Sequence, residues 1–402
     1  MKRLTIIVAG LLFLFGCSGS SSPPAVTVND VSDVEDDPDK GLNAVAREEL
    51  ATAGLNKYMG EFEPAQSVDV GDGWIQHVFD PDGGNGPMCV AGTAFSAFTK
   101  AKNPASLLIM LQGGGACWQD FYNCNILAEA QAPPPPPVGI WADSFDTGNS
   151  VIPNPNGDWS IVYMPYCDGS VFSGDNDVVD ASFPFGPIRF HRGLRNLTAG
   201  IDLAKSMFPH ASRIMVAGSS AGGVGAAGFA PFLARFAYGN TQQLMIFNDA
   251  GPVAINTLDV ENVLARANDW QFGQFFPASC TDCDDLGQGT TIIKWRLDND
   301  VTVRDSFYST DGDLTNRFFL NVPTQEMYRD LIVTEHGLLN DAYPDRYKRF
   351  IRSGDDSHTA LQTPLFYLAE ADGVPLHEWT GEFLVQVRPM WIDIVEEFVP
   401  VP

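Results

Sequence analysis

The chain has 402 residues, a length that fits two or three domains or one large α/β domain. Hydrophobic residues make up 45 % and charged residues 18 %, which excludes wholesale disorder, and the glycines and prolines follow no repeat, which excludes collagen-like and coiled-coil chains. Acidic residues outnumber basic ones 50 to 24, for a net charge of −26. Such a charge repels phosphate backbones, so nucleic acid is not expected as a partner.

The first residues have the pattern of an export signal. Two basic residues precede an apolar run from residue 4 to residue 16, which is too short to span a bilayer. Cys17 follows directly, as in a bacterial lipobox, which predicts residues 1–16 as a signal peptide and Cys17 as the lipidated first residue. Ser18 favours sorting to the outer membrane of a Gram-negative host. Plain signal cleavage and secretion is the alternative, and both predict an exported protein.

Two segments lack the pattern of folded structure. Residues 17–44 are rich in serine, glycine and proline and then in acidic residues, which predicts a lipidated, disordered tether. Residues 45–402 are then expected to form a single folded domain. Within it, residues 131–138 include five consecutive prolines and predict a stiff exposed loop.

Six cysteines follow Cys17, and an even number in an exported chain predicts disulfides. Two of them form a CxxC pair, for which we expect a small local disulfide. Half a zinc site or a redox pair is the alternative, although no second CxxC or HxxxH accompanies it. The six are Cys89, Cys117, Cys124, Cys167, Cys280 and Cys283.

Short apolar runs alternate with helical patterns along the rest of the chain. Such runs are typical of the buried strands of a parallel sheet. They span residues 107–111, 161–164, 214–216, 244–247 and 292–295. Helices are expected at 191–208 and 221–237, and charged helical material at 305–345 is expected to form a cap or lid. This order predicts a doubly wound α/β fold, a mostly parallel sheet with helices on both faces.

A G-x-S-x-G sequence, residues 218–222, follows the third apolar run and opens a helix. This is the context of a nucleophile elbow, in which the turn is too tight for a Cβ at the flanking glycines. A plain glycine-rich turn is the alternative reading. The strand before it and the small residues after it favour Ser220 as a nucleophile.

A glycine run, Gln112 to Gly115, follows the first apolar run. Esterases use such a run to direct backbone N–H groups at the substrate carbonyl oxygen. A flexible loop is the alternative, but the run stands one strand–helix unit before the elbow. We therefore expect the N–H groups of Gly114, Gly115 and Ala221 to form an oxyanion hole.

The general base is expected to be a histidine that follows Ser220, because the triad runs in the order Ser, Asp or Glu, His in this arrangement. Three of the six histidines precede Ser220. His336 lies inside a predicted helix and His377 opens another, whereas His358 lies in a loop after a strand-like segment. Elimination therefore favours His358.

The acid that orients this histidine is expected after a late strand. Asp300 and Asp298 both follow the apolar run near residue 295, and Asp300 is preferred with Asp298 as the alternative. Asp249 follows the strand after the elbow, one unit early, and is expected to be a structural residue near the nucleophile.

Four segments of the chain, taken together, resemble the pectinacetylesterase family, which includes plant pectin acetylesterases and Notum carboxylesterases. They are LQGGGACW at 111–118, PYCDGSVFSG at 165–174, AGSSAGG at 217–223 and NDAG at 248–251. The resemblance spans about residues 72–360, and the pair His358-Thr359 is similar to bacterial members. The family's acid stands in a D-x-x-Q pattern, and the sequence after Asp300 lacks the glutamine.

The resemblance implies an α/β-hydrolase-type fold and ester hydrolysis by a Ser–His–Asp triad without metal or cofactor. It also implies the disulfides Cys89–Cys167 and Cys117–Cys124, which leave Cys280 and Cys283 as the local pair.

The expected function is that of a monomeric serine esterase whose partner is an acylated carbohydrate. By resemblance the substrate is acetyl groups on an acidic polysaccharide such as pectin, and a patch of Arg189, His191 and Arg192 is a candidate to bind it. Esters with longer acyl, lipid-type or aryl groups are the alternative. A non-catalytic, glycan-binding surface lipoprotein is the alternative from another class.

Overall fold

A computed structural model describes residues 40–81, 84–126, 138–240, 242–385 and 391–401. The predicted signal peptide, Cys17, the tether up to residue 39 and the proline run up to residue 137 lie outside the described residues. Leu42 is buried and bridges to Asp300, and helix α1 (Ala44–Thr52) packs in the core. The folded part therefore begins slightly before residue 45.

A ten-stranded sheet forms the centre of the described structure. Its first two pairs are antiparallel, β3 also pairs antiparallel with β9, and all pairs from β9 to β18 are parallel. In spatial order the strands are β1 (Gln66–Gly71), β2 (Trp74–Val78), β3 (Ser96–Lys100), β9 (Trp159–Met164), β4 (Asn103–Leu111), β12 (Arg213–Ser219), β13 (Gln243–Asp249), β14 (Arg304–Thr310), β15 (Tyr347–Arg352) and β18 (Ile394–Val395). This mostly parallel sheet confirms the α/β-hydrolase-type fold.

The chain changes direction across the sheet next to β4. From β4 it crosses to β9 on one side, and it then returns to β12 on the other side of β4. The strands that follow β12 in the sequence extend the sheet outward in order. A doubly wound sheet opens a crevice at such a switch point, beyond the carboxyl ends of the strands.

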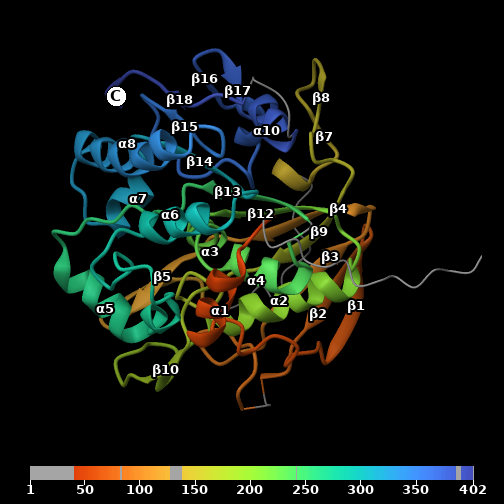
Figure 1. Cartoon of the computed structure of the whole chain (residues 1–402), viewed down its shortest axis with the longest axis vertical. Helices are drawn as coiled ribbons and strands as arrows, with labels where there is room; N and C mark the ends of the chain where they lie inside the picture. The colour runs from red at the N-terminus through yellow and green to blue at the C-terminus, as the bar shows by residue number, and fades with distance from the viewer. Residues whose placement is uncertain (1–39, 82–83, 127–137, 241, 386–390, 402) are drawn as a thin grey trace, which may run out of the picture. The chain divides into compact units, whose positions relative to one another are not determined.

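Helices cover both faces of the sheet. On one face, alternate strand residues such as Ile109 and Val216 form a core with helices α1, α2, α4, α6 and α8. On the other face, residues such as Met110 and Ala217 pack against η3, α9 and α10. Figure 1 shows α1, α2 and α4 grouped on one side of the sheet and α10 on the other.

The remaining elements are short hairpins and helices that connect the strands. The helices are α2 (Gly193–Met207), α3 (Ala221–Ala227), α4 (Ala230–Tyr238), α5 (Val260–Trp270), α6 (Thr290–Asn299), α7 (Leu314–Phe319), α8 (Gln325–Ala342), α9 (Leu365–Leu368), α10 (Leu376–Leu384), η3 (Gly139–Trp141) and η4 (Phe272–Phe275). The hairpins are β5 (Gly115–Trp118) with β6 (Phe121–Cys124), β7 (Ser144–Asp146) with β8 (Val151–Pro153), β10 (Asn176–Val179) with β11 (Ile188–His191), and β16 (Glu370–Ala371) with β17 (Val374–Pro375).

Four of the five predicted strands are present, but the run at 292–295 is helical and belongs to α6. A four-residue apolar run carries no periodicity that separates a strand from a buried helix. The helical period is shown by Lys294, within the run, which pairs with Asp298 four residues later on the exposed side at 2.7 Å.

Residues 305–345 also differ from the prediction of a cap or lid. They begin with β14, a buried strand of the central sheet, before the helices α7 and α8. Four of the strand's seven residues are buried polar ones, and their partners lie elsewhere in the chain: Asp305 pairs with Arg296, and Ser306 donates to the carbonyl of Ile246. A polar strand of this kind has no apolar run to reveal it.

The three disulfides are Cys89–Cys167, Cys117–Cys124 and Cys280–Cys283, which confirms all the predicted pairs. Cys280 and Cys283 are therefore a local disulfide. None of the helices in the described ranges has the length and apolar content needed to span a bilayer.

Candidate active site

The carboxyl ends of five parallel strands bring the glycine run, Ser220 and the loop of His358 to one edge of the sheet. The glycine run follows β4, and Ser220 follows β12, whose Gly218 pairs with Leu111 at the end of β4. Ser219 pairs with Asp249 at the end of β13. The segments after β14 and β15, which pair at Thr310 and Arg352, complete this edge.

Ser220 occupies a strained turn between β12 and α3. Its backbone angles are φ 53° and ψ −121°, a region that residues other than glycine rarely adopt. Such a conformation costs about 1–3 kcal/mol and persists where the surroundings enforce it. A Cβ at Gly218 would lie 2.1 Å from the carbonyl oxygen of Gly222, and one at Gly222 would lie 2.2 Å from that of Leu111. The flanking glycines are therefore required, as predicted for a nucleophile elbow.

The glycine run lies directly against this turn. A Cβ placed on Gly113 would be 2.8 Å from the Cβ of Ser220. Gly115 and Ala221 line the same cavity as Ser220, and Gly114 lies between Gly113 and Gly115. The three predicted oxyanion donors thus belong to segments that adjoin the nucleophile.

His358 lies in the loop after β15 and contacts a carboxylate at hydrogen-bond distance. Its Nδ1 is 2.7 Å from Oδ2 of Asp313, whose side chain is fully buried. The other ring nitrogen, Nε2, is buried and has no hydrogen-bond partner in the described part of the chain. A carboxylate on Nδ1 favours the tautomer in which Nε2 accepts a proton, as a general base requires.

Asp313 is held in place from several directions. Its Oδ1 accepts from the backbone N–H of Asn316 at 2.8 Å, which makes Asp313 the N-cap of α7. Asn316 in turn donates to the carbonyl of Ala250, next to the end of β13, at 2.9 Å. The end of β14 also contacts the histidine loop, since Thr310 donates to the carbonyl of Ser357 at 2.5 Å. The carboxylate and the imidazole are therefore both fixed to the sheet edge.

The prediction of Asp300 as the orienting acid is wrong. Asp300 comes before β14, at the amino edge of the sheet, and forms a buried ion pair with Arg235 at 2.7 Å. The alternative, Asp298, is paired with Lys294 on α6. Both predictions assumed that residues 292–295 form a strand ending at the site. Asp313 follows strand β14, which the sequence did not predict because four of the strand's seven residues are buried and polar.

Asp249 connects the elbow to the histidine loop. Its carboxylate accepts from the Ser219 hydroxyl at 2.5 Å and from the backbone N–H groups of Ala360 and Leu361 at 3.0 and 2.9 Å. Its backbone carbonyl accepts from the N–H of Ser220 at 2.8 Å. Burial raises the pKa of Asp249 to about 6, although these hydrogen bonds oppose that shift. The structure thus places Asp249 next to the nucleophile, where the sequence indicated a structural residue.

The histidines set aside from the sequence lie away from this edge or deep in the core. His336 is buried in α8 and stacks on Phe307 with ring centroids 3.6 Å apart. Burial and the nearby charge of Arg349 lower the pKa of His336 to about 3, so it stays neutral near neutral pH. His377 is the second residue of α10 and lies near Tyr367.

The expected basic patch of Arg189, His191 and Arg192 does not form an exposed cationic surface. Arg189 is fully buried and pairs with Asp180 at 2.7 Å and Asp269 at 2.6 Å. Arg192 pairs with Asp177 at 2.6 Å. Burial and the charge of Arg189 lower the pKa of the buried His191 to about 3. This set is therefore neutralised internally, and the prediction that it binds an acidic polysaccharide is wrong.

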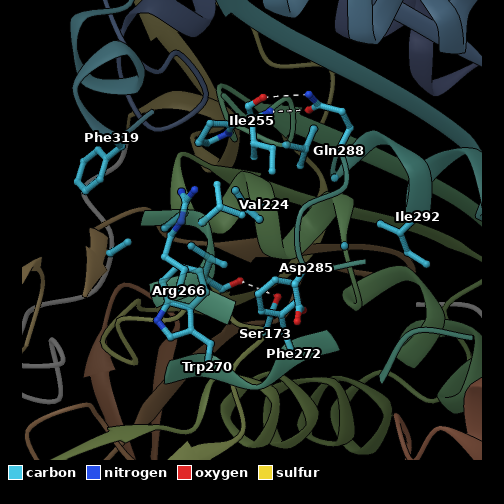
Figure 2. Close-up of a pocket in the computed structure, with 18 of the residues that line it drawn as sticks. Ser173, Val224, Ile255, Arg266, Trp270, Phe272, Asp285, Gln288, Ile292 and Phe319 are labelled. Atoms are coloured by element: carbon cyan, nitrogen blue, oxygen red, sulfur yellow. Dashed lines mark hydrogen bonds between the residues drawn. The ribbon is translucent and has the colours of Figure 1, made fainter. Parts of the chain in front are cut away.

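Ser220 lines a largely apolar cavity of about 170 Å³. Figure 2 shows other residues of its wall, among them Val224, Trp270 and Phe319. Its wall contains aromatic rings from several segments, together with Val224, Ile255 and Ile292. The aromatic residues are Trp118, Phe229, Trp270, Phe272, Phe276 and Phe319. For comparison, an apolar cavity of about 150 Å³ in another protein takes a benzene ring, so this cavity has room for a ring-sized group.

The model of a protein family described as Pectinacetylesterase matches residues 79–264. The matched part contains the glycine run, the elbow with Ser220, and Asp249. No curated protein matches the chain. The family indicates a carboxylic ester hydrolase, and the family and the disulfides together point to an exported protein. Over this segment the chain is similar to the pectinacetylesterase family.

Proposed function

We propose that this protein is a serine carboxylic-ester hydrolase in which Ser220 is the nucleophile, His358 the general base and Asp313 the orienting acid. The observation that supports this proposal most strongly is the hydrogen bond of 2.7 Å between His358 and Asp313 at the sheet edge that also carries Ser220. The buried, unpartnered Nε2 of His358 is the atom that would take the serine proton. The strained backbone at Ser220 adds support, since a protein that only binds glycans needs no such turn.

The proposed reaction has two acyl-transfer steps. His358 takes the hydroxyl proton of Ser220 as the oxygen attacks the ester carbonyl, and the imidazolium then protonates the leaving alcohol. A water molecule, deprotonated by the same imidazole, attacks the acyl enzyme, and the acid leaves as Ser220 regains its proton. The N–H groups of Gly114, Gly115 and Ala221 are the proposed oxyanion donors, and loss of one such donor costs about 3 kcal/mol of transition-state stabilisation.

The proposed substrate is an acetylated polysaccharide such as pectin, and the support for it is the family match. A second candidate, an ester with a larger apolar or aromatic acyl group, is favoured by the cavity at Ser220. Its volume of about 170 Å³ is larger than an acetyl group fills, and its aromatic wall suits an apolar acyl group. The acyl group that gives the highest kcat/KM decides between the two.

The test compares wild type with Ser220→Ala and His358→Ala on p-nitrophenyl acetate. We expect both variants to lose activity by several orders of magnitude, because the members of a triad act as a unit. His210→Ala is the matched control, since His210 is exposed and lies after α2, remote from the sheet's carboxyl edge. Equal rates for wild type and Ser220→Ala would contradict the proposal and favour a non-catalytic glycan-binding protein.

Two sets of substrates then determine the substrate class. The first measures acetate release from acetylated pectin and acetylated xylan. The second uses p-nitrophenyl esters from acetate to decanoate, with benzoate as the aromatic member. A maximum at acetate supports the polysaccharide acetylesterase, and a maximum at a longer or aromatic ester supports the second candidate.

We also propose that the mature protein is a lipoprotein anchored through Cys17, with residues 17–39 as the tether. The sequence pattern and the exported character of the family support this. Mass spectrometry of the mature N-terminus tests it: a diacylglyceryl cysteine is the expected result. An unmodified N-terminus would support plain secretion.

A further inference from the structure

Hairpin β5–β6 follows the glycine run without a break in the chain. Gly115 is the first residue of β5 and lies opposite Cys124, the last residue of β6. The disulfide Cys117–Cys124 cross-links the two strands. The hairpin therefore begins at one of the proposed oxyanion donors, and a covalent bond closes it next to that donor.

The peptide unit between Gly114 and Gly115 is held from the β6 side. The carbonyl of Gly114 accepts a hydrogen bond from the backbone N–H of Asn125 at 2.7 Å. Because the C=O and the N–H of one trans peptide point in opposite directions, this bond turns the N–H of Gly115 away from β6. Gly115 also lines the cavity that contains Ser220. The orientation of a proposed oxyanion donor therefore depends on where β6 places Asn125.

The glycine run and β6 pack in direct contact. Gly115 has a φ of +78°, and a Cβ there would lie 2.1 Å from the carbonyl oxygen of Asn123 on β6. A Cβ on Gly114 would lie 2.6 Å from Nδ2 of Asn125 and 2.5 Å from the ring of Tyr166. A displacement of β6 would therefore displace the peptide unit between the two glycines.

The two strands of the hairpin are not held equally well. Three of the four residues of β5 are buried. The N–H of Cys117 donates to the carbonyl of Gly169 at 2.8 Å, and its carbonyl accepts from the indole of Trp270 at 2.7 Å. The residues of β6 are half-buried or exposed, and the hydrogen bond of 2.7 Å from Tyr122 to Asp180 lies at the opposite end from the disulfide. A two-stranded hairpin is marginally stable by itself, so the end of β6 depends on its cross-link to β5.

We propose that the Cys117–Cys124 disulfide positions the oxyanion hole, because it holds β6 where Asn125 fixes the peptide between Gly114 and Gly115. The N–H of Gly115 is then directed at the substrate oxygen. The two cysteines and Asn125 are positioning residues, since they act through Gly115 and touch no reacting atom. This inference rests on the proposed ester hydrolase function and adds a covalent requirement to it.

The test removes the cross-link from the full-length protein by the double change Cys117→Ala and Cys124→Ala. An oxyanion donor acts in the transition state, so kcat per active site on p-nitrophenyl acetate should fall while KM changes little. Loss of one donor costs about 10²–10³ in kcat, so a displaced donor is expected to cost about tenfold to hundredfold. Complete labelling with an organophosphonate counts the active sites.

Affinity for phenylboronic acid is the second readout. Its tetrahedral adduct on a serine places an oxygen where the oxyanion of the transition state lies. The dissociation constant of this adduct should rise by about the same factor as kcat per active site falls.

The double change Cys280→Ala and Cys283→Ala is the matched control. It also removes a local disulfide, with a sequence separation of 3, but from the segment before α6 and not from the hairpin. Its kcat per active site and its affinity for phenylboronic acid are expected to equal those of wild type.

A second pair of variants keeps the disulfide and changes Asn125. Asn125→Pro removes the N–H that donates to Gly114, whereas Asn125→Ala keeps it. The proline variant should reproduce the loss in kcat and in affinity for phenylboronic acid, and the alanine variant should lose far less of both.

A purely structural role of the disulfide would reduce the amount of folded enzyme, but kcat and affinity for phenylboronic acid at the remaining sites would equal those of wild type. That result overturns the proposal. Wild-type kcat in folded Asn125→Pro also overturns it, and this variant decides the question if the protein without Cys117 and Cys124 does not fold. Absence of p-nitrophenyl acetate hydrolysis by wild type would instead mark the failure of the ester hydrolase proposal.

Discussion

Replacing Asp313 by asparagine is expected to abolish turnover while leaving the protein folded. Asparagine has the same shape and is an equally good N-cap, so its Oδ1 can still accept from Asn316 and the cap of α7 survives. The opposite side of the residue faces Nδ1 of His358 at 2.7 Å, where an amide N–H₂ would replace an accepting oxygen. The imidazole would then turn Nδ1 into the acceptor and place its proton on Nε2, which is the wrong tautomer for a base.

The same change in a serine protease triad reduces kcat about 10⁴-fold, so we expect a loss of about 10³–10⁴-fold here. The free energy of unfolding should change by less than about 1 kcal/mol, since the cap is kept. The assay combines kcat on p-nitrophenyl acetate with urea unfolding followed by circular dichroism.

Asp300→Asn is the matched control, because it makes the same chemical change in an equally buried aspartate. It leaves Arg235 without its anionic partner, so we expect about 3–5 kcal/mol of lost stability and near wild-type turnover in the protein that remains folded. Asp313→Asn with more than a tenth of wild-type kcat would refute the assignment. So would a folded Asp300→Asn protein without activity.

Three further changes test contacts that support the site or the fold. Asp249→Ala leaves buried hydrogen-bond donors unsatisfied, so urea unfolding should show a free energy of unfolding lower by at least about 2 kcal/mol. In the same variant kcat should fall more than KM changes. A wild-type free energy of unfolding and a wild-type kcat would contradict the proposed link to the histidine loop. The pKa of His336 is about 3, so it stays neutral in the folded state while the unfolded chain binds a proton below pH 6.5. Stability is therefore lost as pH falls from 6.5 toward 3, by at most about 4 kcal/mol from this residue, and His336→Phe should flatten the dependence of unfolding on pH; an unchanged slope would contradict this. Replacing Cys89 and Cys167 by serine removes a disulfide between residues 78 apart and should lower the free energy of unfolding in denaturant by about 4 kcal/mol. A change near zero would contradict a stabilising role for this disulfide.

The parts of the fold that depend on continuous apolar runs could be predicted from the sequence. Strands β4, β9, β12 and β13 are buried on both faces, so each appears as an apolar run. The elbow and the glycine run could be placed for the same reason, because each directly follows such a strand. The order rule and elimination led to His358, which the structure places beside Asp313.

The acid could not be predicted, because two local signals were misleading. Polar residues of β14 have partners far away in the sequence, such as Ile246 for Ser306 and Ser357 for Thr310, and a local pattern cannot reveal them. The apolar run in α6 has the pattern of a buried strand, and a strand there would have placed Asp300 at the site.

The most direct measurement is to treat the protein with an organophosphonate that reacts with activated serines, and to map the adduct by mass spectrometry. Because the proposed mechanism directs the base and the oxyanion donors at one hydroxyl, a single adduct on Ser220 is expected, which fragmentation distinguishes from an adduct on Ser219. Labelling and loss of esterase activity should proceed at the same rate. His358→Ala should label far more slowly. Adducts on a different residue, or hydrolysis that continues after Ser220 is fully labelled, would contradict the account.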